Sequence, residues 1–406
     1  MYGIVERVVK DGSILLTTDG IKKVPLLLEE GKVVDISTFE NVEVNQDEIE
    51  KEIKNRIKTE IQRKMKEKIF NKYENEILKN KKFVEKAKEI AIRIKLALLE
   101  QRDFIVRFHA DADGVSGALA FRKLFKKDYF GKSFFIPQKV ACYSQNDLDN
   151  DEFISLTLKK PLLVFIDFSP KERMLNDIKN ETIIIDHHPT GVKDSLNPWN
   201  FDMDSKITAG LLSCFIIKLI MGEDLYFLEK ISLHGDRSEL LDKREEEFEK
   251  LAIVVDYLIT KNKLSSIEKI LKRKESIEEI YVEAKNLIEN AISKAKKFGK
   301  LININNYSIY ILNLSKQKAY PQPGKIVSIF QERLNDEKAI TMGISKNAIS
   351  VRVGKEILKK VNIFELLKEM DAEFGGHKNA FSIRSNNKKE VLKQFLDKLK
   401  SELKKK

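Results

Sequence analysis

Histidines and acidic residues of the kind that bind metal ions gather at four places in this sequence. In chain order these are residues 109–114 (His-Ala-Asp-Ala-Asp-Gly), Asp167, residues 186–188 (Asp-His-His) and Asp236 within residues 234–237 (His-Gly-Asp-Arg). Carboxylate oxygens and imidazole nitrogens together suit Mn²⁺ or Mg²⁺, and crowded carboxylates repel one another unless a cation lies among them. Because four of the five histidines of the chain lie in these clusters, the sequence predicts a divalent-metal site.

Short apolar runs lead into three of these four places. Residues 104–108, 162–166 and 182–185 have the pattern of buried strands, and the segments between them have helical patterns. Strands that alternate with helices predict a parallel sheet, and the carboxyl ends of parallel strands meet at one edge. Open α/β sheets bind their ligands at that edge. We therefore expect an α/β domain that brings the clusters together.

The rest of the chain divides into segments of different character, and 406 residues exceed what one hydrophobic core accommodates. The expected parts are a small β-module (1–45), a basic helical segment (46–100), the parallel-sheet domain (101–245), a helical connector (246–300) and a second, smaller α/β domain (301–406). A β-module of this kind often binds single strands, but it can equally serve packing or protein contact.

Local patterns give the expected elements of the two outer parts. In the β-module we expect strands at residues 3–9, 13–17, 23–28 and 32–36. In the last part we expect strands at 302–314, 339–344 and 348–353, a helix at 361–370, a glycine-rich turn at Gly375-Gly376-His377 and a lysine-rich helix at 388–406.

The chain is basic, with a net charge of +11. Residues 51–100 hold 16 Lys and Arg against 8 Asp and Glu, so this helical segment carries most of the excess. One interpretation is a solvated, bracing helix; the other is a face that tracks phosphates through Lys64, Lys66 and Lys68. The excess favours a polyanionic partner, although lysine-rich surfaces are also a general feature of thermophile proteins.

The same sequence argues against a membrane protein. No apolar run reaches the length of a membrane span, and no signal pattern begins the chain. The two cysteines, Cys142 and Cys214, fit a reducing compartment and are too few for a structural zinc site. We expect a cytoplasmic location.

Taken together, the motifs resemble those of the DHH phosphoesterase superfamily, and within it those of archaeal RecJ-like nucleases. Residues 111–114 (Asp-Ala-Asp-Gly) match the first motif, Asp167 the second, residues 186–188 the third and Asp236 the fourth. Residues 375–380 (Gly-Gly-His-Lys-Asn-Ala) match the GGHxxA signature of the DHH-associated C-terminal domain. The resemblance covers roughly residues 101–385 and implies a parallel-sheet DHH domain followed by that smaller domain.

The resemblance also implies roles for single residues. Two Mn²⁺ or Mg²⁺ ions would be held by Asp111, Asp113, Asp167, His187 and Asp236, with Asp167 as the bridge. His188 would contact the scissile phosphate, and Asp186 would orient the histidine pair from behind. His109 departs from the pattern, since bacterial RecJ enzymes carry Asp there, and it is a further candidate ligand.

For the second domain the resemblance implies substrate binding. Gly375 and Gly376 would allow close approach of the backbone to a phosphate, to which His377 would donate, and Arg352 in residues 350–352 (Ser-Val-Arg) would bind substrate. A plain tight turn is the alternative interpretation of the glycine pair.

Two further stretches allow both a functional and a structural interpretation. Thr208-Ala209-Gly210 precedes a helix and could bind phosphate through its amides, but a simple N-cap explains it equally well. Trp199 and Phe201 could stack on bases, although core packing is the preferred interpretation.

Three functions follow for comparison. The first is a metal-dependent exonuclease on single-stranded DNA or RNA, in replication or repair, with single-stranded nucleic acid and a replication or repair protein as partners. The second is a phosphodiesterase for dinucleotides or very short oligoribonucleotides. The third is a non-catalytic replication or repair scaffold, which the presence of all five implied ligands disfavours.

Overall fold

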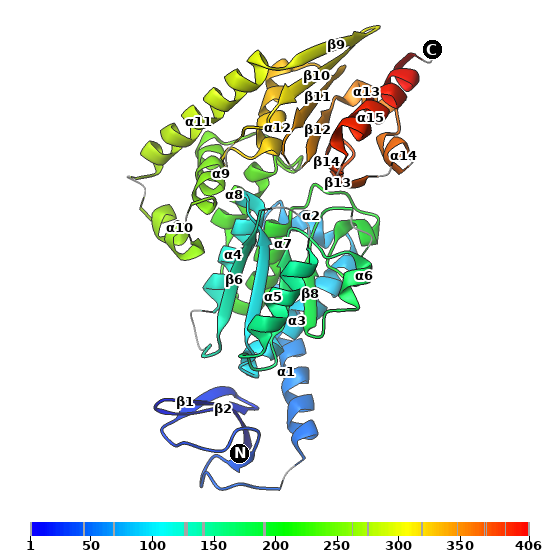
Figure 1. Ribbon diagram of the computed structural model, residues 1–406. Helices are drawn as coiled ribbons and strands as arrows, with labels where there is room; N and C mark the ends of the chain where they lie inside the picture. The colour runs from blue at the N-terminus through cyan, green and yellow to red at the C-terminus, as the bar shows by residue number, and fades with distance from the viewer. Residues whose placement is uncertain are drawn as a thin grey trace. The chain divides into compact units, whose positions relative to one another are not determined.

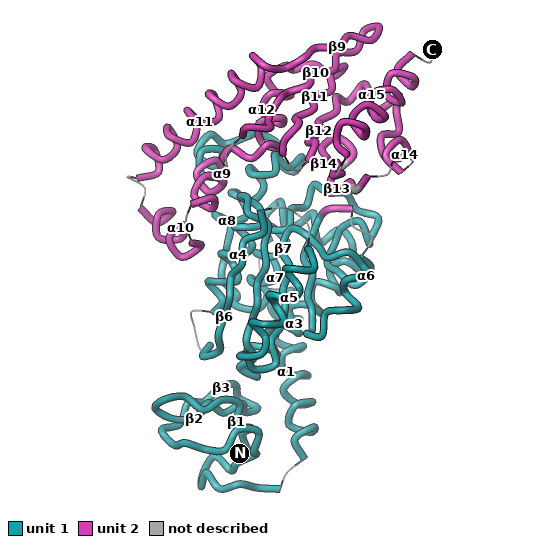
Figure 2. Tube along the Cα trace, in the orientation of Figure 1, with its two compact units in different colours: residues 1–187, 191–252 teal, residues 188–190, 253–406 magenta. Residues whose placement is uncertain are grey.

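The computed structural model describes residues 2–43, 45–67, 70–125, 129–139, 143–189, 192–261, 263–273, 276–317, 320–346, 348–368, 370, 372–385 and 387–404. The chain forms two compact units (Figure 2). Unit 1 comprises residues 1–187 and 191–252, and unit 2 comprises residues 188–190 and 253–406. Cys142 and Lys68 lie outside the described residues.

Unit 1 begins with an antiparallel sheet in the order β3-β2-β1-β4. Its strands are β1 (Tyr2–Val9), β2 (Gly12–Thr17), β3 (Gly20–Val24) and β4 (Val33–Asp35). Sequence reasoning expected the third strand at 23–28, and this is wrong. The strand pairs from Gly20, opposite Thr17, and ends before Pro25, which has no N–H to donate to a ladder.

Three helices follow the β-module: α1 (Gln46–Glu67), α2 (Glu74–Leu78) and α3 (Lys81–Leu99). α1 buries isoleucines at every fourth position, namely Ile49, Ile53, Ile57 and Ile61, as expected for a helix with one apolar stripe. The ammonium of Lys64 pairs with Glu60 at 2.7 Å and donates to the carbonyl oxygen of Ile220 over 2.5 Å. Lys64 therefore braces the helix against α7 (Ala209–Met221).

Unit 1 also contains a four-stranded parallel sheet in the order β6-β5-β7-β8. Its two outer strands, β6 and β8, are labelled in Figure 1. Its strands are β5 (Phe104–His109), β6 (Ser133–Gln138), β7 (Leu162–Ile166) and β8 (Glu181–Ile185), and the connections carry α4 (Ala112–Leu124), α5 (Gln145–Ser155) and α6 (Glu172–Leu175). β5 and β7 are buried along nearly their whole length, as strands of a parallel sheet covered on both faces are.

Close packing holds α4 against the sheet and against α7. A Cβ atom on Gly117 of α4 would lie 2.6 Å from Ile166 Cγ2 of β7 and 2.8 Å from Ser213 Oγ of α7. Only glycine therefore fits where these three elements meet. α8 (Tyr226–Gly235) packs on both α4 and α7, and its last residue, Gly235, lies against Ala112 at the start of α4.

Unit 2 contains a six-stranded mixed sheet in the order β13-β14-β12-β11-β10-β9. The strands are β9 (Lys300–Ile304), β10 (Tyr307–Asn313), β11 (Ala339–Ile344), β12 (Ile349–Val353), β13 (Glu373–His377) and β14 (Ala380–Arg384). The helices are α9 (Glu246–Ile259), whose first half belongs to unit 1, α10 (Leu264–Leu271), α11 (Ile277–Lys297), α12 (Pro323–Leu334), α13 (Lys355–Lys360), α14 (Ile363–Lys368) and α15 (Lys388–Lys404).

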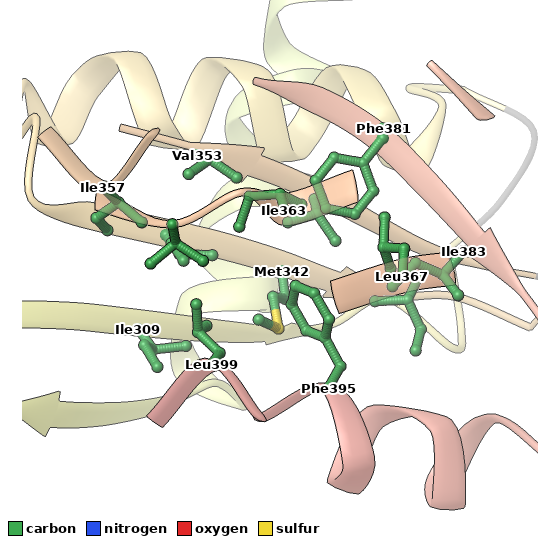
Figure 3. Packing of buried hydrophobic residues seen from close by; sticks show 14 of the residues in the cluster. Ile309, Met342, Val353, Ile357, Ile363, Leu367, Phe381, Ile383, Phe395 and Leu399 are labelled. Carbon is green, nitrogen blue, oxygen red and sulfur yellow. The ribbon is translucent and has the colours of Figure 1, made fainter. Parts of the chain in front are cut away.

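Alternate residues of the sheet in unit 2 enter two separate cores. Ile309 packs with Phe395 and Leu399 of α15 on one face (Figure 3). Leu312 packs with α11 and α12 on the other face. This alternation follows from the two-residue period of a strand, and it makes unit 2 a sheet covered on both sides by helices.

The α/β class is confirmed, with a parallel sheet in unit 1 and further sheets in both units. Three expectations for unit 2 are wrong in detail. The single strand expected at 302–314 is the antiparallel pair β9 and β10, with a turn at residues 305–306. The helix expected at 361–370 is limited to α14, and Gly375-Gly376-His377 lies within strand β13, with the turn at residues 378–379. The division into five parts stays a prediction. Among the described residues, none of the helices combines the length and apolarity needed to cross a membrane.

Candidate metal centre

The turn after β5 positions the first acidic cluster. Asp111 is the N-cap of α4, and its Oδ1 accepts the backbone N–H of Gly114 at 3.1 Å. A Cβ atom on Gly114 would lie 2.2 Å from the carbonyl oxygen of His109, so the turn requires glycine at this point. The other oxygen of Asp111, Oδ2, lies 2.7 Å from Nδ1 of His109.

Asp167 follows β7 and stands between two histidines. Its Oδ2 lies 3.2 Å from His109 Nδ1, and its Oδ1 lies 3.3 Å from His187 Nε2. The residue is 1% exposed and has a φ of 64°. The left-handed region costs a residue with a side chain roughly 1 kcal/mol, and such strain gathers at functional sites. This conformation turns the carboxylate toward both histidines.

His187 is the residue through which the second group of ligands meets. Its Nε2 lies 3.0 Å from Asp236 Oδ2 and 3.7 Å from Asp113 Oδ2. Its Nδ1 lies 3.0 Å from the backbone carbonyl oxygen of Ser205. A carbonyl only accepts, so Nδ1 carries a proton, and Nε2, which faces the carboxylates, is the nitrogen left to bind a metal.

Asp113 is held by the amino end of α7. Its Oδ1 accepts the N–H of Gly210 at 2.7 Å and its Oδ2 the N–H of Ala209 at 3.0 Å. The hydroxyl of Ser232 in α8 donates to Oδ1 at 2.5 Å. Helix amides therefore bind an anion here, but that anion is the side chain of Asp113. Thr208 caps the helix, as the N-cap interpretation of residues 208–210 expects. The amides of Ala209 and Gly210 bind a carboxylate of the chain itself.

Six predicted ligands thus lie in two adjoining groups within unit 1. His109, Asp111 and Asp167 form one group, and Asp113, His187 and Asp236 form the other; within each group one ligand atom per residue lies within 4.8 Å of the others. Carboxylate oxygens and imidazole nitrogens are the donor set that Mn²⁺ and Mg²⁺ accept. The residues present therefore fit a divalent metal ion.

The pKa values of Asp113 and His187 reflect the negative charge gathered at the carboxyl edge of the parallel sheet. Burial raises the pKa of Asp113 well above its ordinary value, and the neighbouring Asp167 and Asp236 raise it further. Burial alone would lower the pKa of His187, but Asp167 and Asp236 raise it well above the ordinary value. A bound cation would satisfy the same excess of negative charge.

The two remaining residues of the Asp-His-His motif differ in position. Asp186 is fully buried, and its Oδ1 accepts the backbone N–H of His187 at 2.8 Å. His188 is half-buried and begins the three-residue stretch that groups with unit 2. The roles assigned to both residues stay predictions. Sequence reasoning missed Ser205, which orients the ring of His187, because a backbone carbonyl has no sequence signature.

His234, in the fourth motif, has a structural role. Its Nδ1 donates to the carbonyl oxygen of Lys230 over 2.8 Å, and its Nε2 accepts the backbone N–H of Glu245 at 3.0 Å. Both ring nitrogens are therefore used in holding the chain after α8. This arrangement leaves Asp236 as the ligand candidate of that motif.

The candidates for substrate binding lie in unit 2. Arg352 in β12 donates through Nε to Ser328 Oγ over 2.8 Å, and its Nη2 faces Gly324 at the start of α12. Gly376 in β13 has a φ of 121°, and a Cβ there would lie 2.5 Å from the carbonyl oxygen of Ala380. This backbone requires glycine. Gly375 has open space at the position of its missing Cβ, and only the backbone of His377, in β13, is described.

The two aromatic residues after Pro198 have different environments. They lie in the short 3-10 helix η1 (Pro198–Phe201). Phe201 packs against Phe83 of α3 with ring centroids 5.2 Å apart, as the core interpretation expects. Trp199 is 38% exposed and donates from its indole nitrogen to the carbonyl oxygen of His187 over 3.0 Å. Core packing is therefore wrong for Trp199.

Comparison with known proteins adds information about the fold. No protein-family model matches the chain. An uncharacterised protein of Methanocaldococcus jannaschii is 24% identical to it, and the match covers 74% of this chain and 51% of that protein. The chain thus spans about half the length of this curated relative.

Three solved structures share the architecture. The DHH domain of a member of a family of ribosomal proteins has a TM-score of 0.73 and 22% identity, covering 89% of this chain and 99% of that one. RecJ from Thermus thermophilus in complex with Mn²⁺ has a TM-score of 0.52 and 15% identity, covering 78% and 54%. Exonuclease RecJ bound to manganese has a TM-score of 0.51 and 12% identity, covering 78% and 94%. The chain therefore shares the fold of this DHH domain and of RecJ.

Proposed function

We propose that this protein is a metal-dependent exonuclease that hydrolyses phosphodiester bonds of single-stranded DNA or RNA. The observation that carries the proposal is the position of Asp167, whose two oxygens face His109 and His187 separately. A carboxylate in this position can bridge two ions. Two of the solved structures with this fold are of RecJ with bound manganese.

His109 and Asp111 would hold one ion and Asp113, His187 and Asp236 the other, with Asp167 shared between the two. A pair of divalent ions supplies an activated hydroxide and stabilises the leaving oxygen of an in-line displacement. The phosphodiester is anionic and would otherwise be repelled by this carboxylate-rich edge. Bound cations would therefore make both substrate binding and hydrolysis possible here.

The residues behind the ligands prepare the site. Ser205 fixes the tautomer of His187, and the amides of Ala209 and Gly210 fix both oxygens of Asp113. Ligands held in this way need no rearrangement when an ion enters, and loss of such supporting contacts usually weakens metal affinity by about 10- to 100-fold.

Residues of unit 2 would bind the substrate. Arg352 is oriented by Ser328, and its guanidinium carries a charge at any physiological pH. A guanidinium beside an uncapped helix start is well suited to a phosphate group. His188 would contact the scissile phosphate.

One observation favours the alternative, a phosphodiesterase for dinucleotides or very short oligoribonucleotides. Lys64, a candidate for tracking a long strand, is instead engaged with Glu60 and the carbonyl oxygen of Ile220. The strand-tracking interpretation of α1 then depends on Lys66, which is exposed. A short substrate would not need that helix.

Purified protein incubated with Mn²⁺ and strands labelled at either end, as DNA and as RNA, tests the proposal. We expect mononucleotides to be released from one labelled end, and no hydrolysis by Asp167→Asn, which keeps the shape of the side chain. Cleavage of dinucleotides but not of longer strands would favour the alternative. Hydrolysis of neither substrate would contradict both.

A further inference from the structure

Trp199 keeps part of its ring in solvent although it lies beside a metal ligand. The side chain is 38% exposed, and its indole N–H donates to the carbonyl oxygen of His187 over 3.0 Å. It is the only tryptophan in the chain. An aromatic face with one fixed edge and one exposed surface can stack on another planar group.

The surrounding chain holds this ring in place. Leu196 forms a parallel bridge with Ile185, the last residue of β8. Asn197 then caps η1 by accepting the N–H of Trp199 at 3.1 Å. The segment that carries Trp199 thus continues the parallel sheet at its metal-binding edge, so the ring has a defined position relative to His187.

A basic surface adjoins the end of η1. The amide side chain of Asn80, which caps α3, donates to the carbonyl oxygen of Phe201 over 2.9 Å. A shallow hollow at this junction is lined by Phe201 and five residues of α3, namely Lys81, Lys82, Glu85, Lys86 and Glu89. The residue that caps α3 therefore contacts the end of η1, the short helix that carries Trp199.

Each acidic residue that lines this hollow pairs with a lysine, whereas two of its lysines have no such pair. Glu85 pairs with Lys88 at 2.7 Å, and Lys86 pairs with both Glu89 at 3.0 Å and Asp194 at 2.7 Å. Lys81 and Lys82 are exposed and form no ion pair with any residue that the structure describes. The hollow therefore presents net positive charge next to Phe201, two residues along η1 from Trp199.

We infer that Trp199, Lys81 and Lys82 form a path along which a single strand of nucleic acid continues beyond the metal centre. One base stacks on Trp199, and the following phosphates lie against the two lysines. Proteins that bind single strands without sequence preference combine aromatic platforms and positive grooves in this way. The inference rests on the proposed function and adds the course of the strand on unit 1.

The single tryptophan provides a direct measurement. A twelve-nucleotide oligothymidylate with phosphorothioate linkages, which resist cleavage, is titrated into the wild-type protein with Mn²⁺ present, while tryptophan emission and the anisotropy of a labelled strand are followed. We expect the emission to fall with the same dissociation constant that anisotropy gives, because the base covers the ring. Binding by anisotropy without any change in emission would overturn the inference.

Variants separate stacking from the anchor to His187. Trp199→Leu removes the aromatic face, and we expect affinity for the strand to fall by about tenfold, within the range of one base stack. Trp199→Phe keeps an aromatic face but loses the N–H, so we expect strand affinity within about threefold of wild type. Equal loss in both variants would assign Trp199 to the anchor alone and contradict stacking.

The role of Lys81 and Lys82 is tested through the salt dependence of strand affinity. We expect Lys81→Gln with Lys82→Gln to reduce the slope of log affinity against log salt by about 0.7 for each lost phosphate contact. The matched control is Lys10→Gln with Lys160→Gln, which removes two exposed lysines, one directly after β1 and one just before β7, and should leave the slope unchanged. An equal change in both double variants, or no change in either, would contradict the path.

Hydrolysis by the wild-type protein with Mn²⁺ is measured in parallel. Binding with loss of emission but no hydrolysis would keep the path and contradict the proposed activity. Hydrolysis combined with unchanged binding by Trp199→Leu would keep the activity and contradict the path.

Discussion

The two edges of the parallel sheet in unit 1 differ in the balance of their buried charges. At the carboxyl edge, Asp111, Asp113, Asp167 and Asp236 meet two histidines. At the amino edge, acidic groups meet basic ones: Asp103, just before β5, accepts from Arg7 of the β-module at 2.6 Å. An excess of one sign of charge thus marks the edge suited to a cation, and matched charges mark the edge that holds the β-module.

The β-module contacts the amino edge of the parallel sheet. Asp103 accepts the backbone N–H groups of Lys132 and Lys159 in addition to Arg7. Lys159 pairs with Glu6 at 3.3 Å. Parallel strands have their amino ends at the edge opposite to their carboxyl ends, so the contacts of β1 lie at the far edge of the sheet from the candidate ligands.

The largest expected effect is on the matched edge. Arg7→Leu leaves Asp103, 2% exposed at its side chain, without its cationic partner. Breaking a buried pair in this way costs about 3 to 5 kcal/mol. We expect urea unfolding to show a loss of this size and the Mn²⁺ affinity of the folded protein to stay unchanged. A loss below about 1 kcal/mol, the range of surface pairs, would remove the distinction between the edges.

Glu6 lies at the same edge, but its burial outweighs the effect of its partner Lys159. The contribution of Glu6 to the free energy of unfolding should therefore depend on pH. Burial raises its pKa from 4.5 to about 7, although Lys159 opposes the shift. The unfolded chain therefore loses this proton first, and stability falls as the pH rises through the interval from about 4.5 to about 7. A shift of this size corresponds to about 3 kcal/mol.

We expect Glu6→Gln to match wild-type stability near pH 4.5 and to exceed it at pH 8. Unfolding free energies of both proteins across this range provide the measurement. Equal stability at both pH values would show that Lys159 compensates the buried carboxylate fully.

At the carboxyl edge we expect changes in metal affinity instead. A Cβ on residue 210 would lie 2.7 Å from Asp113 Oδ1, so Gly210→Ala must displace that carboxylate or the start of α7. We expect Mn²⁺ affinity to fall by about 10- to 100-fold, as for other contacts that support a ligand. Ser213→Ala, in the same helix, is the control that leaves the amides in place, and calorimetric titration separates the two.

A smaller effect is expected at His109. His109→Asp replaces one ligand type with another that the resemblance allows, so we expect activity to be preserved. His109→Ala removes the ligand, and Mn²⁺ affinity should fall by about tenfold. Undiminished affinity in the alanine variant would reduce His109 to a neighbour of the site.

The sequence predicted the strands that carry the ligands because an apolar run before an acidic turn is a local signal. It did not predict β6, because the apolar run of this strand, Phe134 to Ile136, is only three residues long and half-buried or exposed, and Pro137 follows it. It placed β3 too late because the pairing of Gly20 with Thr17 is set by the hairpin. It could not assign Ser205 or the amides of α7, since backbone groups have no residue type and their meeting with His187 and Asp113 depends on tertiary packing.

The stoichiometry of Mn²⁺ binding tests the central claim most directly, because Asp167 is proposed to serve two ions. Calorimetric titration of the full chain should give two Mn²⁺ ions per protein, and Asp167→Asn should weaken both binding events while the protein stays folded. Binding of a single ion by the wild-type chain, or two ions with unchanged affinity in Asp167→Asn, would contradict the account.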